Sequence, residues 1–102
     1  MSQFDNVSVD VAANFYFEGK VTSRNVHFAD GSRKTLGVML PGEFTFGTSQ
    51  HELMEITAGK LEVKLPGQDW QTVGAGGSFT IEANASFDVK VIEPVDYCCS
   101  YS

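Results

Sequence analysis

The stretch Lys60-Leu61-Glu62-Val63-Lys64-Leu65 alternates strictly between charged and aliphatic side chains. Successive side chains of a β-strand point to opposite faces, so this pattern predicts a strand with one dry face and one wet face. Phe87-Asp88-Val89-Lys90-Val91 alternates in the same way. Gly59 precedes the first stretch and Pro66-Gly67 follows it, as expected for the turns that end a strand.

A period of two continues through most of the chain. Further strands are expected at residues 21–28, 36–40, 44–46, 51–57, 70–73, 78–81 and 97–101. Glycine and proline turn signals, including Gly59 and Pro94, recur about every eight to twelve residues, which is typical of an antiparallel sandwich or barrel. Residues 7–14 fit a short helix or a strand, and the alternation of Val7, Val9 and Val11 favours an edge strand or one that crosses to another subunit.

The composition restricts the classes of function that are open to the chain. Its 102 residues suit one domain, and seven Lys and Arg against a net charge of −6 argue against a nucleic acid polymer as partner. The N-terminus lacks the basic and apolar regions of a signal peptide, and no run approaches the roughly 20 apolar residues of a membrane helix. We therefore expect a cytoplasmic protein without a membrane partner.

Adjacent cysteines, Cys98 and Cys99, are the only ones in the chain. Neighbouring residues on a strand point to opposite faces, so they are poorly placed to form a framework disulfide. Two free thiols are expected, one of them packed inside the domain.

Glu52 is the residue whose place in the pattern is most informative about function. In the expected strand 51–57, Met54 and Ile56 share one face, and Glu52 belongs to that face. If this face lines the interior, a carboxylate points into an apolar cavity, where it is costly unless something pairs with it. Inward polar groups of this kind often mark a ligand site. The alternative is that Glu52 lies at the mouth of the strand and contacts water.

Cations near a predicted rim are the other candidates for chemistry. Arg33 and Lys34 precede the strand that begins near Thr35, and the planar fork of arginine binds two oxygens of an anion at once. The alternative for both is a solvated turn. His27 and His51 are far apart and form no His-X-His pattern, so no metal site is expected from them.

Four segments carry a resemblance to a known family: FEGKV (17–21), GVMLPGEFTF (37–46), ELMEITAG (52–59) and YCCSY (97–101). In this order and spacing they resemble the small pyrimidine/purine nucleoside phosphorylase family. The resemblance covers about residues 14–102, and residues 1–13 resemble an extension that shorter members lack. It implies an all-β, single-domain cupin-like antiparallel β-barrel of the jelly-roll type, usually paired into a homodimer.

The implied activity is that of a pentosyltransferase. Such an enzyme splits purine and pyrimidine nucleosides with inorganic phosphate as co-substrate, releasing a free base and ribose 1-phosphate. Glu52 to Gly59 fits the cupin Glu-(six residues)-Gly element, but the preceding His-X-His is absent and Phe87 stands where a second-motif His is expected. The resemblance therefore implies a barrel without metal and a reaction without a cofactor.

Under this resemblance the site residues receive roles. Glu52 is the candidate catalytic carboxylate beside the ribose, and Arg33 is the candidate clamp for phosphate. Hydroxyl donors are expected from Thr45 and Thr48, and an aromatic wall for the base is expected from Phe46 or Phe87. Two further arrangements stay open. Glu52 and Arg33 form a plain structural ion pair, or the domain is a non-enzymatic cupin that binds a sugar or nucleotide.

A sugar isomerase or epimerase is the third class. That chemistry needs a proton-shuttling base, usually a histidine with a nearby acid. Neither histidine of this sequence is obviously inside the domain, so this class ranks below the other two.

Overall fold

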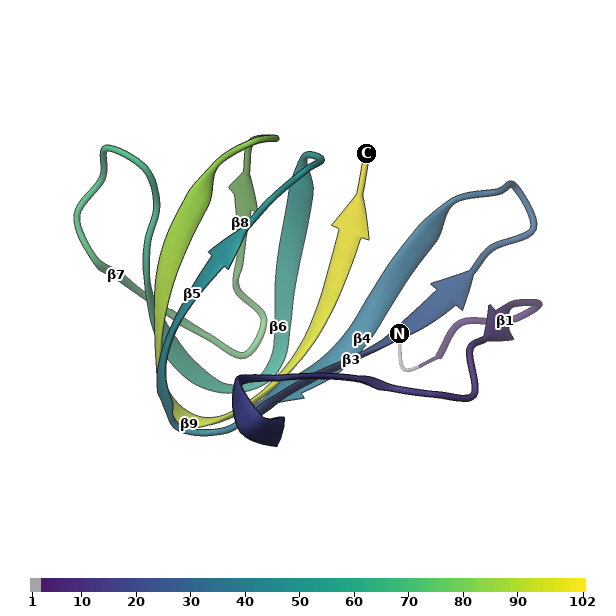
Figure 1. Cartoon of the computed structure of the whole chain (residues 1–102), viewed down its shortest axis with the longest axis horizontal. Helices are drawn as coiled ribbons and strands as arrows, with labels where there is room; N and C mark the ends of the chain where they lie inside the picture. The colour runs from purple at the N-terminus through teal and green to yellow at the C-terminus, as the bar shows by residue number, and fades with distance from the viewer. Residues whose placement is uncertain (1–2) are drawn as a thin grey trace.

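Nine strands and one three-residue helical turn make up the computed structural model, which describes residues 3–102 (Figure 1). Every ladder between these strands is antiparallel, so the expectation of an all-β antiparallel domain is confirmed. The elements are β1 (Ser8–Val9), β2 (Asn14–Tyr16), η1 (Phe17–Gly19), β3 (Val21–His27), β4 (Arg33–Met39), β5 (Gly42–Gly47), β6 (Glu52–Lys64), β7 (Gln71–Gly74), β8 (Ser78–Ile81) and β9 (Ser86–Tyr101).

Two long strands, β6 and β9, organise the sheet. They pair with each other along their length, and each of them takes different partners at its two ends. β9 pairs with β5 through its first half and with β4 through its second, while β6 pairs with β8 through its first half and with β7 through its second. Because both strands bend, the sheet curves into a trough that is open on one side in Figure 1.

The sequence predicts that strands end at Gly59 and Pro94, and this prediction is wrong. The sheet bends at these two residues instead. Both residues lie inside strands, at register shifts of the β6–β9 ladder between Ile56 and Leu61. Gly59 has φ +86°, and a Cβ built on it would lie 2.0 Å from the Pro94 carbonyl oxygen. A bulge absorbs a left-handed glycine and a proline without an N–H while the ladder continues on either side. The two strands predicted at 51–57 and 60–65 are therefore one.

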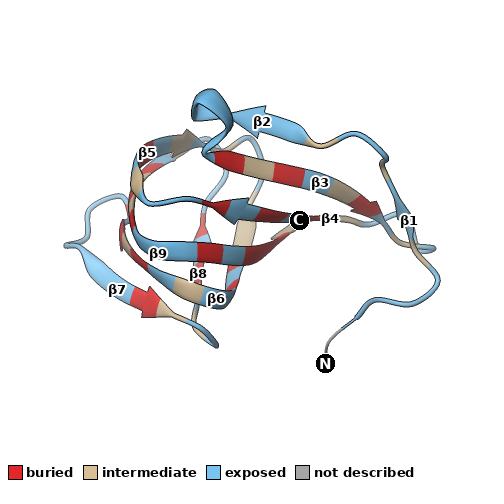
Figure 2. Cartoon of the chain, turned by 90° about the horizontal axis from the view of Figure 1, so that it is seen from below, coloured by how far each residue is buried: buried red, intermediate tan, exposed pale blue. Residues whose placement is uncertain are grey.

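The concave face of the trough carries the core, and Figure 2 shows buried and exposed residues alternating along β3, β4 and β9. Leu61 and Val63 are fully buried, as the opening alternation predicts. In β4 the buried residues are Thr35, Gly37 and Met39, so the apolar side chains of Leu36, Val38 and Leu40 occupy the opposite, exposed face.

The edges of the sheet do not meet. The strand order is β1-β3-β4-β9-β6-β7, with β2, β5 and β8 branching from β3, β9 and β6, and within residues 3–102 no ladder joins the two ends. Closure into the expected barrel is therefore not confirmed. No helix within the described part of the chain is long and apolar enough to span a bilayer.

The first strand lies within the expected N-terminal extension. Ser8 pairs with His27 and Val9 with Val26, so β1 lies on the free edge of β3. Farther along, Asn14 to Tyr16 pair with the other half of the same edge as β2. The N-terminal segment is thus attached to the domain along β3 by two short ladders.

Candidate active site

A cavity of about 200 Å³ lies on the concave face of the trough. Aromatic residues dominate its lining, together with aliphatic side chains and a few polar groups from β3, β6 and β9. The lining consists of Tyr16, Val21, Ser23, Met39, Phe46, Gly47, Glu52, Met54, Phe87, Tyr97, Cys99 and Tyr101. A concave apolar site with few convergent polar groups is the usual form of a small-molecule site.

Glu52 supplies the carboxylate in this cavity. It is the first residue of β6 and shares a face with the buried side chains of Met54 and Ile56, which agrees with their spacing in the sequence. Its partners across the two ladders are Tyr101 on β9 and Ile81 on β8. Burial raises the pKa of the half-buried Glu52 carboxyl, while a hydrogen bond from Cys99 and the charge of Arg33 act in the opposite direction.

The hydrogen bond to Glu52 comes from a thiol of the last strand. Cys99 Sγ donates to Glu52 Oε1 over 3.6 Å. Burial raises the pKa of the Cys99 thiol to about 12, so it stays a protonated donor at neutral pH. Both cysteines are free and both are buried, although one buried thiol was expected.

Two tyrosines of β9 add hydroxyl groups to the lining. Tyr101 shares a hydrogen bond of 3.1 Å between its hydroxyl and Thr35 Oγ1, and burial raises its pKa to about 12. The Tyr97 hydroxyl donates to the Thr22 carbonyl oxygen at 2.9 Å, and burial raises its pKa as well. Both phenols are therefore neutral at physiological pH.

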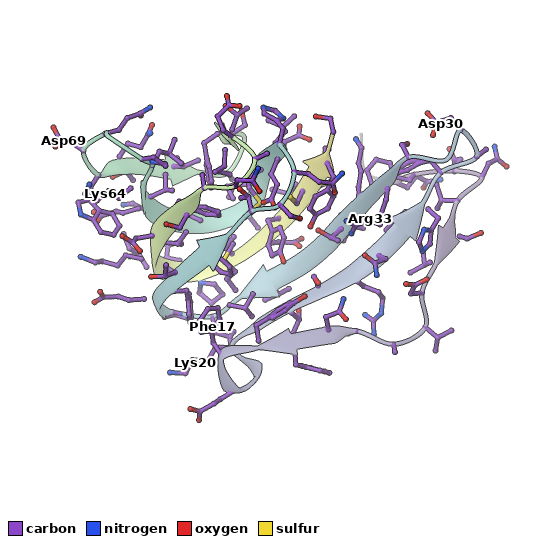
Figure 3. All side chains as sticks on the ribbon, turned by 45° about the horizontal axis from the view of Figure 1, so that its top comes forward. Phe17, Lys20, Asp30, Arg33, Lys64 and Asp69 are labelled. Carbon is purple, nitrogen blue, oxygen red and sulfur yellow. The ribbon has the colours of Figure 1, made fainter. Side chains whose placement is uncertain are left out.

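Arg33 lies beside the cavity rather than in its lining. It is the first residue of β4, and Figure 3 shows it between β4 and the end of β9. Its guanidinium carbon lies 4.1 Å from the centroid of the Tyr101 ring, and its Nη1 donates to Asn25 Oδ1 at 2.9 Å. Within residues 3–102 no ion pair joins Arg33 to Glu52; the ion-pair contact found there is between His27 and Asp10. The plain ion pair left open by the sequence is therefore not formed.

Phe46 and Phe87 form an aromatic wall of the cavity. They are cross-strand partners on β5 and β9, with ring centroids 5.5 Å apart and ring planes inclined by 28°. Phe17 packs edge-on against Phe46, with centroids 5.4 Å apart. Phe17 has φ +52° at a bulky residue, so the turn η1 holds it in an unusual backbone conformation against the wall.

The two predicted threonines lie outside the cavity lining. Thr45 Oγ1 donates to Asp88 Oδ1 at 2.7 Å on the exposed side of β5. Thr48 Oγ1 donates to the Glu82 carbonyl oxygen at 2.6 Å and accepts from the Ala85 N–H at 3.0 Å. These hydroxyls are engaged with the protein itself, and Thr48 fastens the loop before β9 to the end of β5.

Several cavity residues were not singled out from the sequence. Tyr97, Cys99 and Tyr101 alternate along β9, and that period of two is a signal that identifies them once Cys99 is taken to face inward. Ser23 and Tyr16 carry no comparable signal, because only the pairing of β2, β3 and β4 brings them to the cavity.

The two histidines lie apart from each other on the surface of the domain. No group of three or more His, Cys, Asp and Glu side chains converges among residues 3–102. His27 Nε2 contacts Asp10 Oδ1 at 2.9 Å, and His51 Nδ1 contacts Ser102 Oγ at 3.2 Å, both on the exposed surface.

Comparisons with known proteins agree on one family. A model described as pyrimidine/purine nucleoside phosphorylase matches residues 11–101. The chain is 60% identical over 102 residues to the pyrimidine/purine nucleoside phosphorylase of Sulfurovum sp., covering 99% of each chain. It is 55% identical over 101 residues to the protein of that name from Chlorobium chlorochromatii, covering 99% of this chain and 98% of the relative.

The fold has a close match among solved structures. A crystal structure of a protein of unknown function from Acinetobacter sp. ADP1 superposes with a TM-score of 0.96 at 39% identity, and the match covers 100% of both chains. The curved sheet described above is thus the fold of this solved relative as well.

Proposed function

The chain belongs to the pyrimidine/purine nucleoside phosphorylase family, and from that membership we propose that its cavity is where phosphorolysis takes place. In this reaction the bond between the ribose anomeric carbon and the base nitrogen breaks, and the base leaves with the electron pair. A phosphate oxygen forms the new bond to the anomeric carbon, which gives ribose 1-phosphate. The attacking hydrogen phosphate gives up its proton as the new bond forms, and the base nitrogen takes up one proton through the solvent, so that protons balance.

The half-buried Glu52 carboxylate, in a cavity lined mainly by aromatic and aliphatic side chains, is the observation that carries this proposal. Positive charge develops at the anomeric carbon as the base leaves. A fixed carboxylate in a site of low dielectric stabilises such charge far better than water does. Its second role is to accept hydrogen bonds from ribose hydroxyls, and the hydrogen bond from the Cys99 thiol orients it.

Phosphate binds at Arg33 in this proposal. The guanidinium is held against the Tyr101 ring, and Tyr101 is the cross-strand partner of Glu52, so the cation and the carboxylate flank the same aromatic side chain. An arginine fork offers two parallel N–H donors to a phosphate dianion. The separation of Arg33 from Glu52 leaves its donors for phosphate, because no ion pair between the two occupies them in the described residues.

The aromatic wall of Phe46 and Phe87 takes the base. Stacking against a ring face accepts purines and pyrimidines alike, since it reads no hydrogen-bonding edge. The cavity of about 200 Å³ is smaller than the roughly 300–1,000 Å³ of sites that enclose a drug-sized ligand. It therefore encloses part of a nucleoside, and the rest of the ligand extends along the open trough.

Other features expected from the family resemblance remain part of the proposal. The curvature of β6 and β9 supports a cupin-like arrangement, and the Glu52-to-Gly59 spacing fits the cupin element. We also propose a cytoplasmic homodimer that uses inorganic phosphate as co-substrate without metal or cofactor, with residues 1–13 as an extension of the domain. Thr45 and Thr48 are left without a substrate contact, because their hydroxyls are bound elsewhere.

The test of the carboxylate is Glu52→Gln beside Glu55→Gln. Glu55 lies on the same strand but is exposed on the opposite face, so it matches the change without entering the cavity. We expect E52Q to lower kcat roughly 10²–10³-fold, the effect of removing one charge-stabilising group, and E55Q to leave it unchanged. Phosphate-dependent turnover by E52Q at the level of E55Q would show that the carboxylate has no catalytic role.

A further inference from the structure

Asn25 on β3 joins a carboxylate of the N-terminal segment to the guanidinium of Arg33. Its Nδ2 donates to Asp10 Oδ2 at 3.0 Å, and its Oδ1 accepts from Arg33 Nη1 at 2.9 Å. Asp10 follows directly after β1, and Arg33 begins β4, so three segments of the chain meet at this amide. The three side chains lie at the same end of the sheet as Glu52 and Tyr101.

Chemistry fixes the orientation of the Asn25 amide. A carboxylate only accepts hydrogen bonds, and a guanidinium only donates them. The NH₂ group of Asn25 must therefore face Asp10, and its carbonyl oxygen must face Arg33. Without Asp10 the amide is free to rotate by half a turn. Its NH₂ group would then face the Arg33 guanidinium, which has no acceptor.

Asp10 is itself held firmly. Its backbone N–H donates to the Asn25 carbonyl oxygen at 3.0 Å, and its second carboxylate oxygen contacts His27 Nε2 at 2.9 Å. Hydrogen bonds from Asn25 and His27 lower the pKa of Asp10, so it is ionised at neutral pH. The neighbouring pairs of β1 with β3 keep this short segment in register.

Arg33 depends on Asn25 for its direction. Within residues 3–102 its guanidinium makes one hydrogen bond, to Asn25, and otherwise rests on the Tyr101 ring at 4.1 Å. A ring face fixes the plane of a guanidinium but not its rotation within that plane, because stacking has no preferred direction in the plane. The single hydrogen bond to Asn25 supplies that rotation and leaves the other guanidinium donors without a protein acceptor in the described residues.

We infer that Asp10 and Asn25 are positioning residues, which orient Arg33 so that its guanidinium binds the phosphate co-substrate. The inference rests on the proposed phosphorolysis and adds a role for the N-terminal segment in it. Neither residue touches substrate. Loss of Asp10 weakens phosphate binding because Arg33 must then be ordered at the moment phosphate arrives.

The test compares Asp10→Ala, Asp10→Asn and Asp5→Ala with the wild type, using uridine as nucleoside and varying inorganic phosphate. We expect D10A to raise the KM for phosphate roughly threefold to tenfold, the net value of about one hydrogen bond, with kcat and the KM for uridine nearly unchanged. D10N keeps an acceptor oxygen for Asn25 and should stay within about twofold of the wild type. D5A removes an exposed carboxylate from the same segment and controls for the change of net charge.

A second measurement reports on Arg33 without turnover. The Nε–H signal of Arg33 in the NMR spectrum, assigned with Arg33→Lys, should be sharp in the wild type and D10N and broadened in D10A. If the wild type catalyses phosphorolysis but D10A shows an unchanged KM for phosphate and an unchanged Arg33 signal, Asp10 has no positioning role. If Arg33→Ala left the KM for phosphate unchanged, the phosphate role of Arg33 would be wrong. If the wild type released no base, the premise itself would be wrong.

Discussion

Gly59→Ala tests the origin of the bend that forms the trough. Gly59 lies inside β6 with φ +86°, and its Cα faces the backbone of Pro94 on β9. An added Cβ would lie 2.0 Å from the Pro94 carbonyl oxygen and 2.9 Å from Val95 Cα. These atoms belong to backbone, so they cannot be relieved by rotating a side chain, and the bulge must open.

Gly67→Ala is the matched control, because Gly67 has φ +72° in the turn after β6 and a Cβ there would meet nothing within 4 Å. An L-residue in the left-handed conformation costs about 1–2 kcal/mol of stability, and both variants carry this cost. Overpacking adds about 1–3 kcal/mol in G59A alone. We therefore expect losses of about 1–2 kcal/mol for G67A and about 2–5 kcal/mol for G59A in the free energy of unfolding.

Urea denaturation followed by circular dichroism measures this difference. In a domain of this size each kcal/mol lowers Tm by roughly 4–8 °C, so thermal unfolding should separate the two variants by about 5 °C or more. G59A should also lose phosphorolysis, because the bend sets the angle between the two halves of β6. Equal destabilisation of G59A and G67A would refute the argument that close backbone contact at Gly59 shapes the trough.

Four further results follow from the cavity. Because burial raises the pKa of Glu52, phosphorolysis should fall as pH drops through that raised value, and a pH–rate profile without such an acid limb would contradict the role of the carboxylate. Cys99→Ala removes the donor that lowers this pKa, so the acid limb should move to higher pH, whereas Cys99→Ser keeps a donor and should stay near the wild type. The same raised pKa destabilises the fold as pH rises through it, so E52Q should be at least as stable as the wild type at pH 7 by urea denaturation. Phe46→Ala should raise the KM for both uridine and adenosine roughly threefold to tenfold by removing one aromatic partner, while Phe15→Ala, an exposed residue on β2, should leave both unchanged; a change confined to one nucleoside would argue against stacking.

The sequence pattern predicted the strands well where a strand has one buried face. Lys60 to Leu65 alternate because Leu61, Val63 and Leu65 face the core, and a period of two reports that arrangement directly. The pattern failed at Gly59 and Pro94, since a residue that ends most strands sits here in a bulge, and only the pairing of β6 with β9 reveals it. Leu36, Val38 and Leu40 show a second limit: their alternation identifies a shared face but not whether that face is buried.

The site was predictable to the extent that it depends on parity within one strand. The spacing of Glu52 from Met54 and Ile56 assigns the three side chains to one face, and the structure shows that this face is the concave one. The roles of Asp10 and Asn25 were not predicted, because the sequence pattern does not give the register of the β1–β3 and β3–β4 ladders that bring them to Arg33. Thr45 and Thr48 illustrate the same limit, since a hydroxyl in the right region gives no sign that another part of the protein already binds it.

Phosphorolysis by the purified protein tests the central claim most directly. The protein is treated with EDTA and incubated with uridine or adenosine, with and without inorganic phosphate, and the free base is separated by chromatography. We predict release of both uracil and adenine that depends on phosphate and is matched by ribose 1-phosphate. Failure to release a base from either nucleoside in the presence of phosphate would contradict the account, and binding of a nucleoside without turnover would indicate a ligand-binding domain instead.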